Sequence, residues 1–195
     1  TTPDKTSGLF LWDKGDGYGA FGTQESVSGG TSDVMEWGEV FGVESDWMTL
    51  SKKEFAYLVG YNGATLDDNC GRAHATSLQH WSSVNGVNGL VLAPDGWDYT
   101  GKPLQDSYTS SEWEDAQSLG LVFLPAAGYY EFSRKIVNFI GSNGYFWTRT
   151  PDAGSGTNAY CFEISENLGK IPNTDSRSHG RSVRLVQRFE KPNKE

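Results

Sequence analysis

The sequence predicts an α+β domain in which two short helices lie among many short strands. Glycine supplies 24 of the 195 residues and is spread evenly, which indicates many tight turns between short elements. Two helix-start signatures fall in the first two-thirds, and apolar runs typical of strands dominate the last third. A chain of this length can bury one full core, so folding requires neither a metal nor a set of disulfides.

The first predicted helix covers about 52–59. Ser51-Lys52-Lys53-Glu54 has the capping-box pattern, in which hydroxyl and carboxylate each pair with a free backbone N–H at the helix start. Leu50 and Phe55 flank this box and can pack together as a hydrophobic staple. Gly60 is suited to end the helix because glycine readily adopts the left-handed conformation.

The second predicted helix covers about 112–119. Ser111-Glu112-Trp113-Glu114 repeats the capping-box spacing, with Glu114 as its carboxylate, and Gly120 is placed to end the helix. Short apolar runs bounded by turn residues predict the strands. These runs are Val87–Ala93, Leu121–Ala126, Tyr145–Thr148, Ala159–Ile164 and Ser182–Phe189.

The chain is predicted to form one domain over 9–189. Residues 1–8 have the composition of a linker or a processed N-terminus, and 190–195 form a short polar tail. No apolar run reaches the 18 or so residues that a membrane-spanning helix needs. A signal segment or a lipid anchor on a removed N-terminus stays open.

The net charge of −9 argues against nucleic acid as a partner, because a phosphate-binding protein carries a basic surface. Residues 1–50 hold two basic and nine acidic side chains, a local charge of −7. Residues 151–195 hold seven and six, with the two signs interleaved. The acidic excess therefore lies at the start of the chain.

Two glycine-rich motifs in the first 25 residues lack the context that their chemistry requires. Gly17–Gly22 matches the dinucleotide-binding pattern, but the residues after it show no helical period to hold a pyrophosphate. Asp13–Gly17 resembles a calcium loop without its third oxygen ligand or its glutamate at position twelve. We therefore expect no cofactor and no metal.

The histidines and cysteines show no catalytic or metal-ligand spacing. His74 and His80 are six residues apart rather than four, and His179 is remote from both. Cys70 and Cys161 are too far apart for a redox motif; unpaired thiols are favoured, and a disulfide in an exported protein stays open. These patterns predict a protein that is not an enzyme.

The segment from 148 to 179 is the most informative surface of the chain. It is small and polar, yet strands flank it and one strand interrupts it, which is how a rigid frame displays binding loops. From the residues alone, a merely solvated surface stays open as the alternative. Aromatic and arginine side chains would anchor a ligand and small polar ones would adapt to it. The predicted ligand-binding residues are Trp147, Arg149, Asp152, Asn158, Glu163, Glu166, Lys170, Asn173, Asp175, Arg177 and His179.

Trp47–Leu58 is similar to the block W-R-T-L-[ST]-x-x-E-W-x-Y-L, and Val84–Trp97 is similar to VNGVNGLILLPDGW. In these blocks the chain resembles surface proteins abundant in gut Bacteroidales, relatives of the "major paralogous domain" group. Leu121–Tyr129 is similar to AVFLPAAGYR. Gly141–Trp147, Asn158–Tyr160 and Gly180–Val186 resemble the family's C-terminal pattern. The blocks run in order over about 36–188, whereas residues 9–35 match poorly.

The resemblance implies a C-type-lectin-like fold, shared with the variable proteins of diversity-generating retroelements. In those proteins the segment that matches 148–179 is hypervariable and binds ligands. The charged residues in this copy of the segment suggest a diversified version. The calcium-dependent sugar motifs of lectins are represented only by fragments, Ile171-Pro172-Asn173 and Trp97-Asp98.

The sequence thus predicts a non-catalytic binding or adhesion domain, exported to a cell surface or the extracellular space, or borne on a phage. The expected partner is a protein or glycan on another cell or phage surface. Two alternatives stay open: an enzyme on the same fold, such as a formylglycine-generating enzyme, and a structural or fimbria-like surface subunit. The closely spaced cysteine pair of formylglycine-generating enzymes is not reproduced by Cys70 and Cys161.

Overall fold

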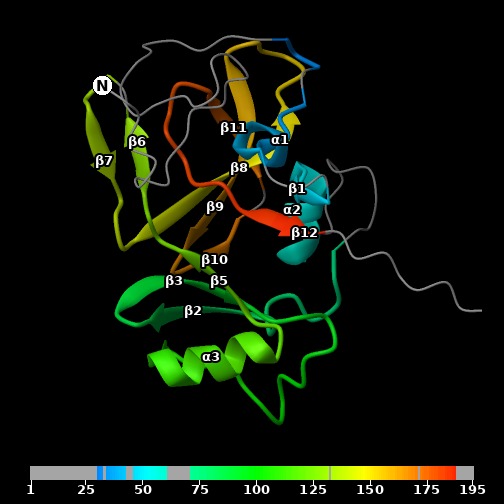
Figure 1. Cartoon of the computed structure of the whole chain (residues 1–195), viewed down its shortest axis with the longest axis vertical. Coiled ribbons are helices and arrows are strands. Elements are labelled where there is room, and N and C mark those ends of the chain that lie inside the picture. Colours follow the sequence, from blue (N-terminus) through cyan, green and yellow to red (C-terminus); the bar gives the residue numbers. More distant parts are fainter. Residues whose placement is uncertain are drawn as a thin grey trace, which may run out of the picture.

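The computed structural model describes residues 30–32, 34–42, 46–60, 71–131, 133–170 and 172–187, with only the backbone of residues 40 and 41. Within these ranges the chain is an α+β structure of short helices and small sheets, as predicted (Figure 1). No helix in the described ranges is long and apolar enough to cross a membrane. The motifs predicted at Gly17–Gly22 and Asp13–Gly17, and also Cys70, lie outside the described residues.

Three helices are described, one more than predicted. Helix α1 (Trp37–Phe41) ends at Gly42, which has a φ of 66°. Helix α2 (Lys52–Leu58) confirms the first predicted helix: Glu54 N donates to Ser51 Oγ at 3.3 Å, and Ser51 N donates to Glu54 Oε2 at 2.7 Å. Leu50 and Phe55 pack in the same apolar cluster, as expected for a staple.

Helix α3 (Ser110–Ser118) begins two residues earlier than predicted, so the assignment of the cap to Ser111 and Glu114 is wrong. The capping box is formed by Thr109 and Glu112, with Thr109 N donating to Glu112 Oε2 at 2.7 Å. Both pairs have the same spacing in the sequence. Tertiary structure selects the earlier one, because strand β4 (Ser107–Tyr108) ends directly before Thr109.

The lower sheet in Figure 1 has the strand order β4-β2-β3-β5. It contains β2 (Gln79–Val84), β3 (Val87–Leu92) and β5 (Val122–Pro125). Asn85 and Gly86 join β2 to β3 with φ values of 51° and 80°, as a two-residue hairpin turn with two left-handed positions requires. Strand β2 was not predicted, because four of its six residues are polar and form no apolar run.

The upper sheet is built around β9 (Asn158–Ser165). Strand β8 (Asn143–Pro151) pairs along one edge of β9, while β10 (Leu168–Gly169) and β11 (Asn173–Ser176) pair along the other. Residues 180–182 run beside the free edge of β8, where Trp147 N donates to Ser182 O at 2.9 Å. The pairing of β8 with β9 shifts register between Trp147 and Pro151.

Two small sheets complete the fold. Strand β1 (Trp47–Thr49) pairs with β12 (Leu185–Gln187), and β6 (Tyr129–Glu131) pairs with β7 (Ile136–Asn138). The last strand is therefore shorter than the predicted 182–189, of which 188 and 189 lie outside the described residues. Its pairing brings the end of the described chain against an early segment.

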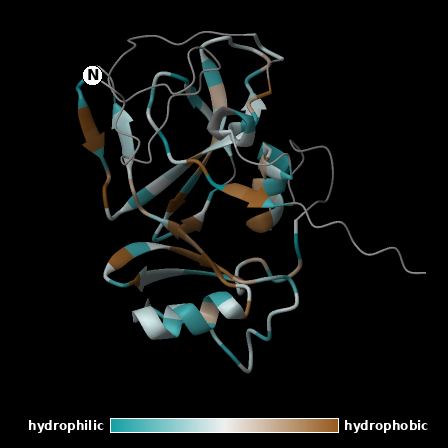
Figure 2. Cartoon of the chain, in the orientation of Figure 1, coloured by the Kyte–Doolittle hydropathy of each residue, from teal (hydrophilic) through white to brown (hydrophobic). Residues whose placement is uncertain are grey.

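Three apolar clusters fill the spaces between these layers. The central cluster lies between the two sheets and α2, and includes Leu90, Leu124 and Phe162. A second lies between the lower sheet and α3, whose outer side is hydrophilic in Figure 2. The third packs α1 on the opposite face of the upper sheet. Each of the two four-stranded sheets is thus packed on both faces, and the upper one only in part.

The capping assignment of α3 is testable with two single variants. Thr109→Ala should lower the free energy of unfolding by about 1 kcal/mol, because the Glu112 N–H loses its acceptor. The control Ser111→Ala should change it by less than about 0.5 kcal/mol. Urea unfolding followed by circular dichroism measures both. A larger loss in Ser111→Ala would restore the assignment predicted from the sequence.

Candidate functional site

The predicted binding residues do not form one surface, but several of them share one face of the upper sheet. Side chains alternate between the faces of a strand, and the register places Tyr145 of β8 opposite Glu163 of β9. On β11, Asn173 and Asp175 lie opposite Cys161 and Ala159 on this same face. We call this the upper face of the sheet.

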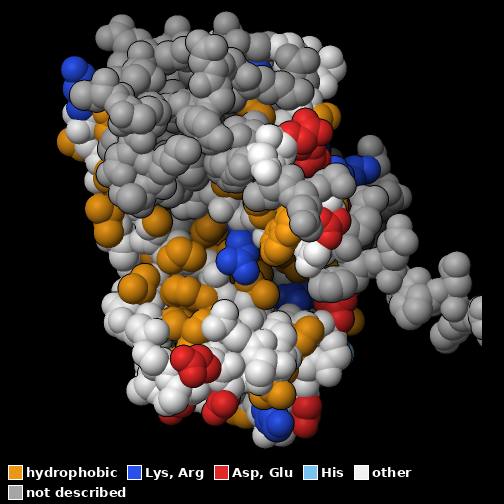
Figure 3. Space-filling model, in the orientation of Figure 1, with side chains coloured by type: hydrophobic (Ala, Val, Ile, Leu, Met, Phe, Trp, Pro, Cys, Tyr) orange, Lys and Arg blue, Asp and Glu red, His pale blue; other side chains and the backbone are white. Residues whose placement is uncertain are grey.

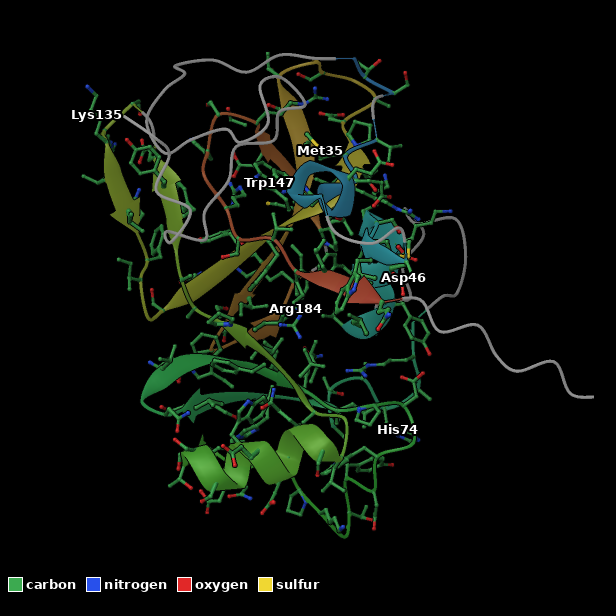
Figure 4. The ribbon with its side chains drawn as sticks, viewed as in Figure 1. Met35, Asp46, His74, Lys135, Trp147 and Arg184 are labelled. Atoms are coloured by element: carbon green, nitrogen blue, oxygen red, sulfur yellow. The ribbon has the colours of Figure 1, made fainter. Side chains whose placement is uncertain are left out.

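The inner half of the upper face is covered by α1 and by Met35, two residues before it. Met35, Trp37 and Trp147 are fully buried there, with Cys161 packed beside them. Figure 4 shows Trp147 and Met35 close together beside α1. Trp147 is therefore a core residue, and its prediction as an exposed ligand anchor is wrong: the strand alternation directs its ring beneath α1.

The rest of the upper face, here called the outer half, includes the end at Tyr145 and Glu163 and the edge formed by β11, and it carries polar and aromatic side chains. Glu163 accepts hydrogen bonds from Asn143 Nδ2 at 3.0 Å and from Lys170 Nζ at 2.6 Å. Tyr145 is half-buried beside them, and burial, aided by the charge of Glu163, raises the pKa of its hydroxyl to about 12. The Tyr145 hydroxyl is thus a neutral donor at physiological pH.

Arg181 lies at the centre of this outer half, fully buried, with its guanidinium facing three aromatic rings. The ring centroids of Tyr145, Trp147 and Tyr129 lie 4.9, 5.0 and 5.2 Å from its central carbon. Nη2 donates to Asp175, and within the described residues Nε and Nη1 donate no hydrogen bond. Cation–π attraction and one carboxylate therefore hold the charge.

Asp175 and His179 complete the cluster around Arg181. His179 Nδ1 lies 3.1 Å from Asp175 Oδ1, and the His179 ring packs against Tyr129 with centroids 5.2 Å apart. Burial alone would raise the pKa of Asp175. The His179 ring, with Nδ1 3.1 Å away, and the charge of Arg181 outweigh that effect and lower the pKa to about 2. Asp175 therefore remains a carboxylate under all physiological conditions.

Arg149 lies apart from this cluster, within the register shift between Trp147 and Pro151 of β8. Its Nη1 donates to Glu36 Oε1 at 2.9 Å, and its Nη2 lies 3.7 Å from Glu54. Its backbone carbonyl accepts from Met35 N and its N–H donates to Leu50 O. Arg149 thus joins the segments before α1 and α2 to the sheet, so its role is structural rather than that of a ligand anchor.

Arg177 was also predicted to bind a ligand, but it is only 2% exposed and donates hydrogen bonds to backbone carbonyls. Its Nε donates to Asn158 O at 2.9 Å and its Nη2 to Gly30 O at 3.0 Å. Asp152 is at the tip of the β8–β9 connection, where Oδ1 accepts from Gly154 N at 2.9 Å. Asp152 and Asn158 therefore shape a loop at the far end of the sheet.

Glu166 faces a different part of the molecule. It lies in the turn between β9 and β10. It lines a groove together with His80 of β2 and Asp106, which directly precedes β4. The predicted set is thus divided among the core, the ends of the sheet, this groove and the outer half of the upper face. The members that gather on that outer half are Glu163, Lys170, Asn173, Asp175 and His179.

Sequence reasoning missed Tyr129, Tyr145 and Arg181. Strand alternation could have shown Tyr145, since it is two residues before Trp147 on the same strand. Tyr129 and Arg181 belong to segments that are separate from β8 in the sequence. The fold brings them beside β8, through the bridges of Gly128 to Gly144 and of Phe146 to Ser182. No local pattern in the sequence indicates this approach.

An apolar flank borders the outer half. Ile136, Phe139 and Ile140 are exposed by 44, 54 and 70%, and the Phe139 ring stacks on Tyr129 with centroids 6.1 Å apart. Figure 3 shows apolar side chains gathered along this side of the molecule, near the β6–β7 hairpin. The surface thus combines apolar area with fixed charges, a combination typical of binding surfaces.

In the described residues, Cys161, His74 and His80 each have a packing or pairing role. Burial raises the pKa of the Cys161 thiol to about 11, so the thiolate is scarce at neutral pH. His74 and His80 pair with Tyr99 and Asp106 at 3.1 and 2.8 Å. In the part of the chain that the structure describes, no three His, Cys, Asp or Glu side chains gather as metal ligands would.

The pairing of Asp175 predicts a pH-dependent stability. A carboxylate whose pKa is lowered by folding stabilises the protein above its unfolded pKa of 3.8, and this stabilisation is lost as the pH falls through about 2. Asp175→Asn should cost roughly 3 kcal/mol at pH 7, because the buried Arg181 loses its counter-ion. The difference from wild type should shrink from pH 4 toward pH 2.

Chemical unfolding at pH 7, 4 and 2 measures this difference. Glu114→Gln, on the exposed side of α3, is the control and should follow the wild type within about 0.5 kcal/mol at each pH. An Asp175→Asn variant as stable as wild type at pH 7 would contradict the role given to the ion pair.

Comparison of the chain with family models, with curated proteins and with solved structures found no match in any of the three. The function is therefore argued from the geometry of the site together with the resemblance of the sequence blocks.

Proposed function

We propose that this protein is a non-catalytic binding domain of the C-type-lectin-like kind, displayed on a cell or phage surface. Its ligand, a protein or a glycan on another surface, would contact the outer half of the upper face. One observation carries the proposal: aromatic, charged and amide side chains from β6, β8, β9, β11 and the 179–181 segment meet there on a paired backbone frame.

The arrangement suits binding because its parts are held in place before a ligand arrives. Glu163 is fixed by Asn143 and Lys170, and the rings of Tyr129 and Tyr145 meet edge to face with centroids 5.1 Å apart. Preorganised side chains lose less conformational entropy when they bind. The Tyr129 and Tyr145 rings would supply apolar contact area, while Lys170 and Asn173 would supply exposed polar contacts.

The positions of the family-like blocks support the C-type-lectin-like assignment. Trp47–Leu58 contains β1 and α2, Val84–Trp97 contains the hairpin turn and β3, and Leu121–Tyr129 contains β5. These blocks therefore supply elements of the frame, whereas the polar segment 148–179 supplies much of the candidate binding surface. A variable protein requires a constant frame and a binding surface whose composition can differ. Here the frame resembles the family, and the surface segment differs from it in composition.

Burial of Cys161 favours binding over the enzymatic alternative. A formylglycine-generating enzyme needs reactive thiols, and the Cys161 thiol has a raised pKa beneath α1. The charged groups on the outer half are also paired with one another, as in Glu163 with Lys170 and Asp175 with Arg181. Such pairing serves recognition by shape and charge.

Binding to arrays of glycans and of fixed bacterial cells tests the proposed surface. Wild-type protein, presented as a tetramer to raise its avidity, should give discrete positive spots. Lys170→Ala and Tyr145→Ala should each reduce binding to those spots about tenfold or more, since both remove contacts at the centre of the surface. The variant Lys53→Ala, which removes an exposed lysine from α2, should bind like wild type.

Thermal unfolding of each variant separates loss of binding from loss of fold. Lys170 is 52% exposed on its side chain, so Lys170→Ala should unfold within a few degrees of wild type. Equal binding by Lys170→Ala, Tyr145→Ala and Lys53→Ala would place the ligand elsewhere and contradict the proposed surface.

The proposed diversification has a separate genetic test. The DNA that flanks the coding sequence should contain a near-copy of the 148–179 segment as a template repeat, together with a reverse transcriptase. The two copies should differ mainly at adenines of the template. A flanking region that contains neither a template repeat nor a reverse transcriptase would contradict diversification by a retroelement. It would not contradict the proposed binding surface.

A further inference from the structure

A groove of about 430 Å³ lies where the lower sheet meets the β9–β10 turn, away from the upper face. Strand β2 contributes His80, Trp81 and Ser83, the segment before β4 contributes Asp106, and the turn contributes Glu166. Gly169 N donates to Gln79 Oε1 at 3.2 Å and ties β10 to the start of β2. None of the roles proposed above uses this groove.

The groove follows an open edge of β2. In the β2–β3 hairpin the two-residue turn makes Val84 and Val87 a hydrogen-bonded pair, so the backbone groups of Trp81 and Ser83 point away from β3. Ser83 N accordingly donates to Asp106 O at 2.9 Å. Strand β4 pairs only with Ser83 and Val84. Among the described residues, the outward N–H and C=O of Trp81 have no partner.

The two sides of this edge differ in chemistry. Trp81 and Leu168 form an apolar wall on the side facing the upper sheet, with Glu166 exposed at its rim. On the other side, His80 Nε2 lies 2.8 Å from Asp106 Oδ1, and the Asp106 side chain is almost fully exposed. A strand added at this edge would direct alternate side chains to these two sides.

The charge of the side chains around the groove indicates which kind of ligand it binds. Among the described residues that line the groove there is no Lys or Arg, whereas Asp106 and Glu166 are present. Residues 71–127 form the lower sheet, α3 and their connections, here called the lower lobe. They hold six acidic and two basic side chains, a local charge of −4. Figure 3 shows acidic side chains near the lower end of the molecule, where α3 lies. A cationic ligand would therefore be attracted to this lobe.

We propose that this groove binds an extended, basic segment of a partner protein, which adds to the edge of β2 as a strand. One residue of the segment would exchange both backbone hydrogen bonds with Trp81, and its apolar side chain would pack on Trp81 and Leu168. The flanking lysine or arginine side chains would reach Asp106, and those one residue further out would reach Glu166. The site holds whether or not the upper face binds its own ligand.

A capped peptide, Ac-Lys-Lys-Val-Lys-Lys-NH2, tests the proposal against the ¹⁵N-labelled full chain. The amide resonance of Trp81 should shift on titration, and its hydrogen exchange should slow at least fivefold at saturation. The double variant Asp106→Asn/Glu166→Gln should weaken the affinity about tenfold. Glu114→Gln, which removes one carboxylate of the same lobe outside the groove, should keep the affinity within twofold.

Two matched ligands decide between strand addition and other modes of binding. A peptide with an N-methylated central valine lacks the donor that Trp81 C=O requires, so its affinity should fall at least tenfold. Equal affinity for both peptides would overturn strand addition and leave only a site for ammonium groups. Shifts at Trp81 caused by lactose or cellobiose but by neither peptide would also overturn it, as would no shift with any ligand at millimolar concentration.

Discussion

The structure depends on the pairing of β9 with neighbours along both of its edges. This pairing fixes which side chains face each layer. Phe162 and Ile164 enter the core shared with the lower sheet, while Ala159 and Cys161 enter the core beneath α1. A shift of the register by one residue would exchange these two sets. Because both faces of β9 are buried along most of its length, the frame resists such a shift, and the side chains on its outer half keep fixed positions.

Arg181 connects this frame to the surface. Its charge is buried among Tyr129, Tyr145 and Trp147 and is balanced by Asp175, so one cation orients groups from three separate segments. A buried ion pair gives modest net stability, but its loss is costly because an uncompensated charge remains. The main effect of the cluster is therefore to specify one arrangement of the aromatic rings. Its contribution to the free energy of unfolding is the smaller effect.

Local signals in the sequence predicted the α+β class, α2 and the strands with apolar runs. They placed the cap of α3 at Ser111 because two equivalent spacings overlap, and only the end of β4 distinguishes them. They also treated every arginine of 148–179 as a ligand anchor. Arg149 and Arg177 instead bind Glu36 and the carbonyl of Gly30, which are more than 100 residues away in the chain. Contacts at such separation leave no pattern within the segment itself.

The two roles found within 148–179 limit how freely that segment can change. Positions such as Lys170 and Asn173 are exposed and can accept most side chains, whereas Arg177 and Trp147 at its border support the frame. A process that altered every codon at random would therefore produce many chains that do not fold. Under the proposed diversification, the exposed positions alone would set the number of usable binding surfaces, so the available diversity would be much smaller than the length of the polar segment suggests.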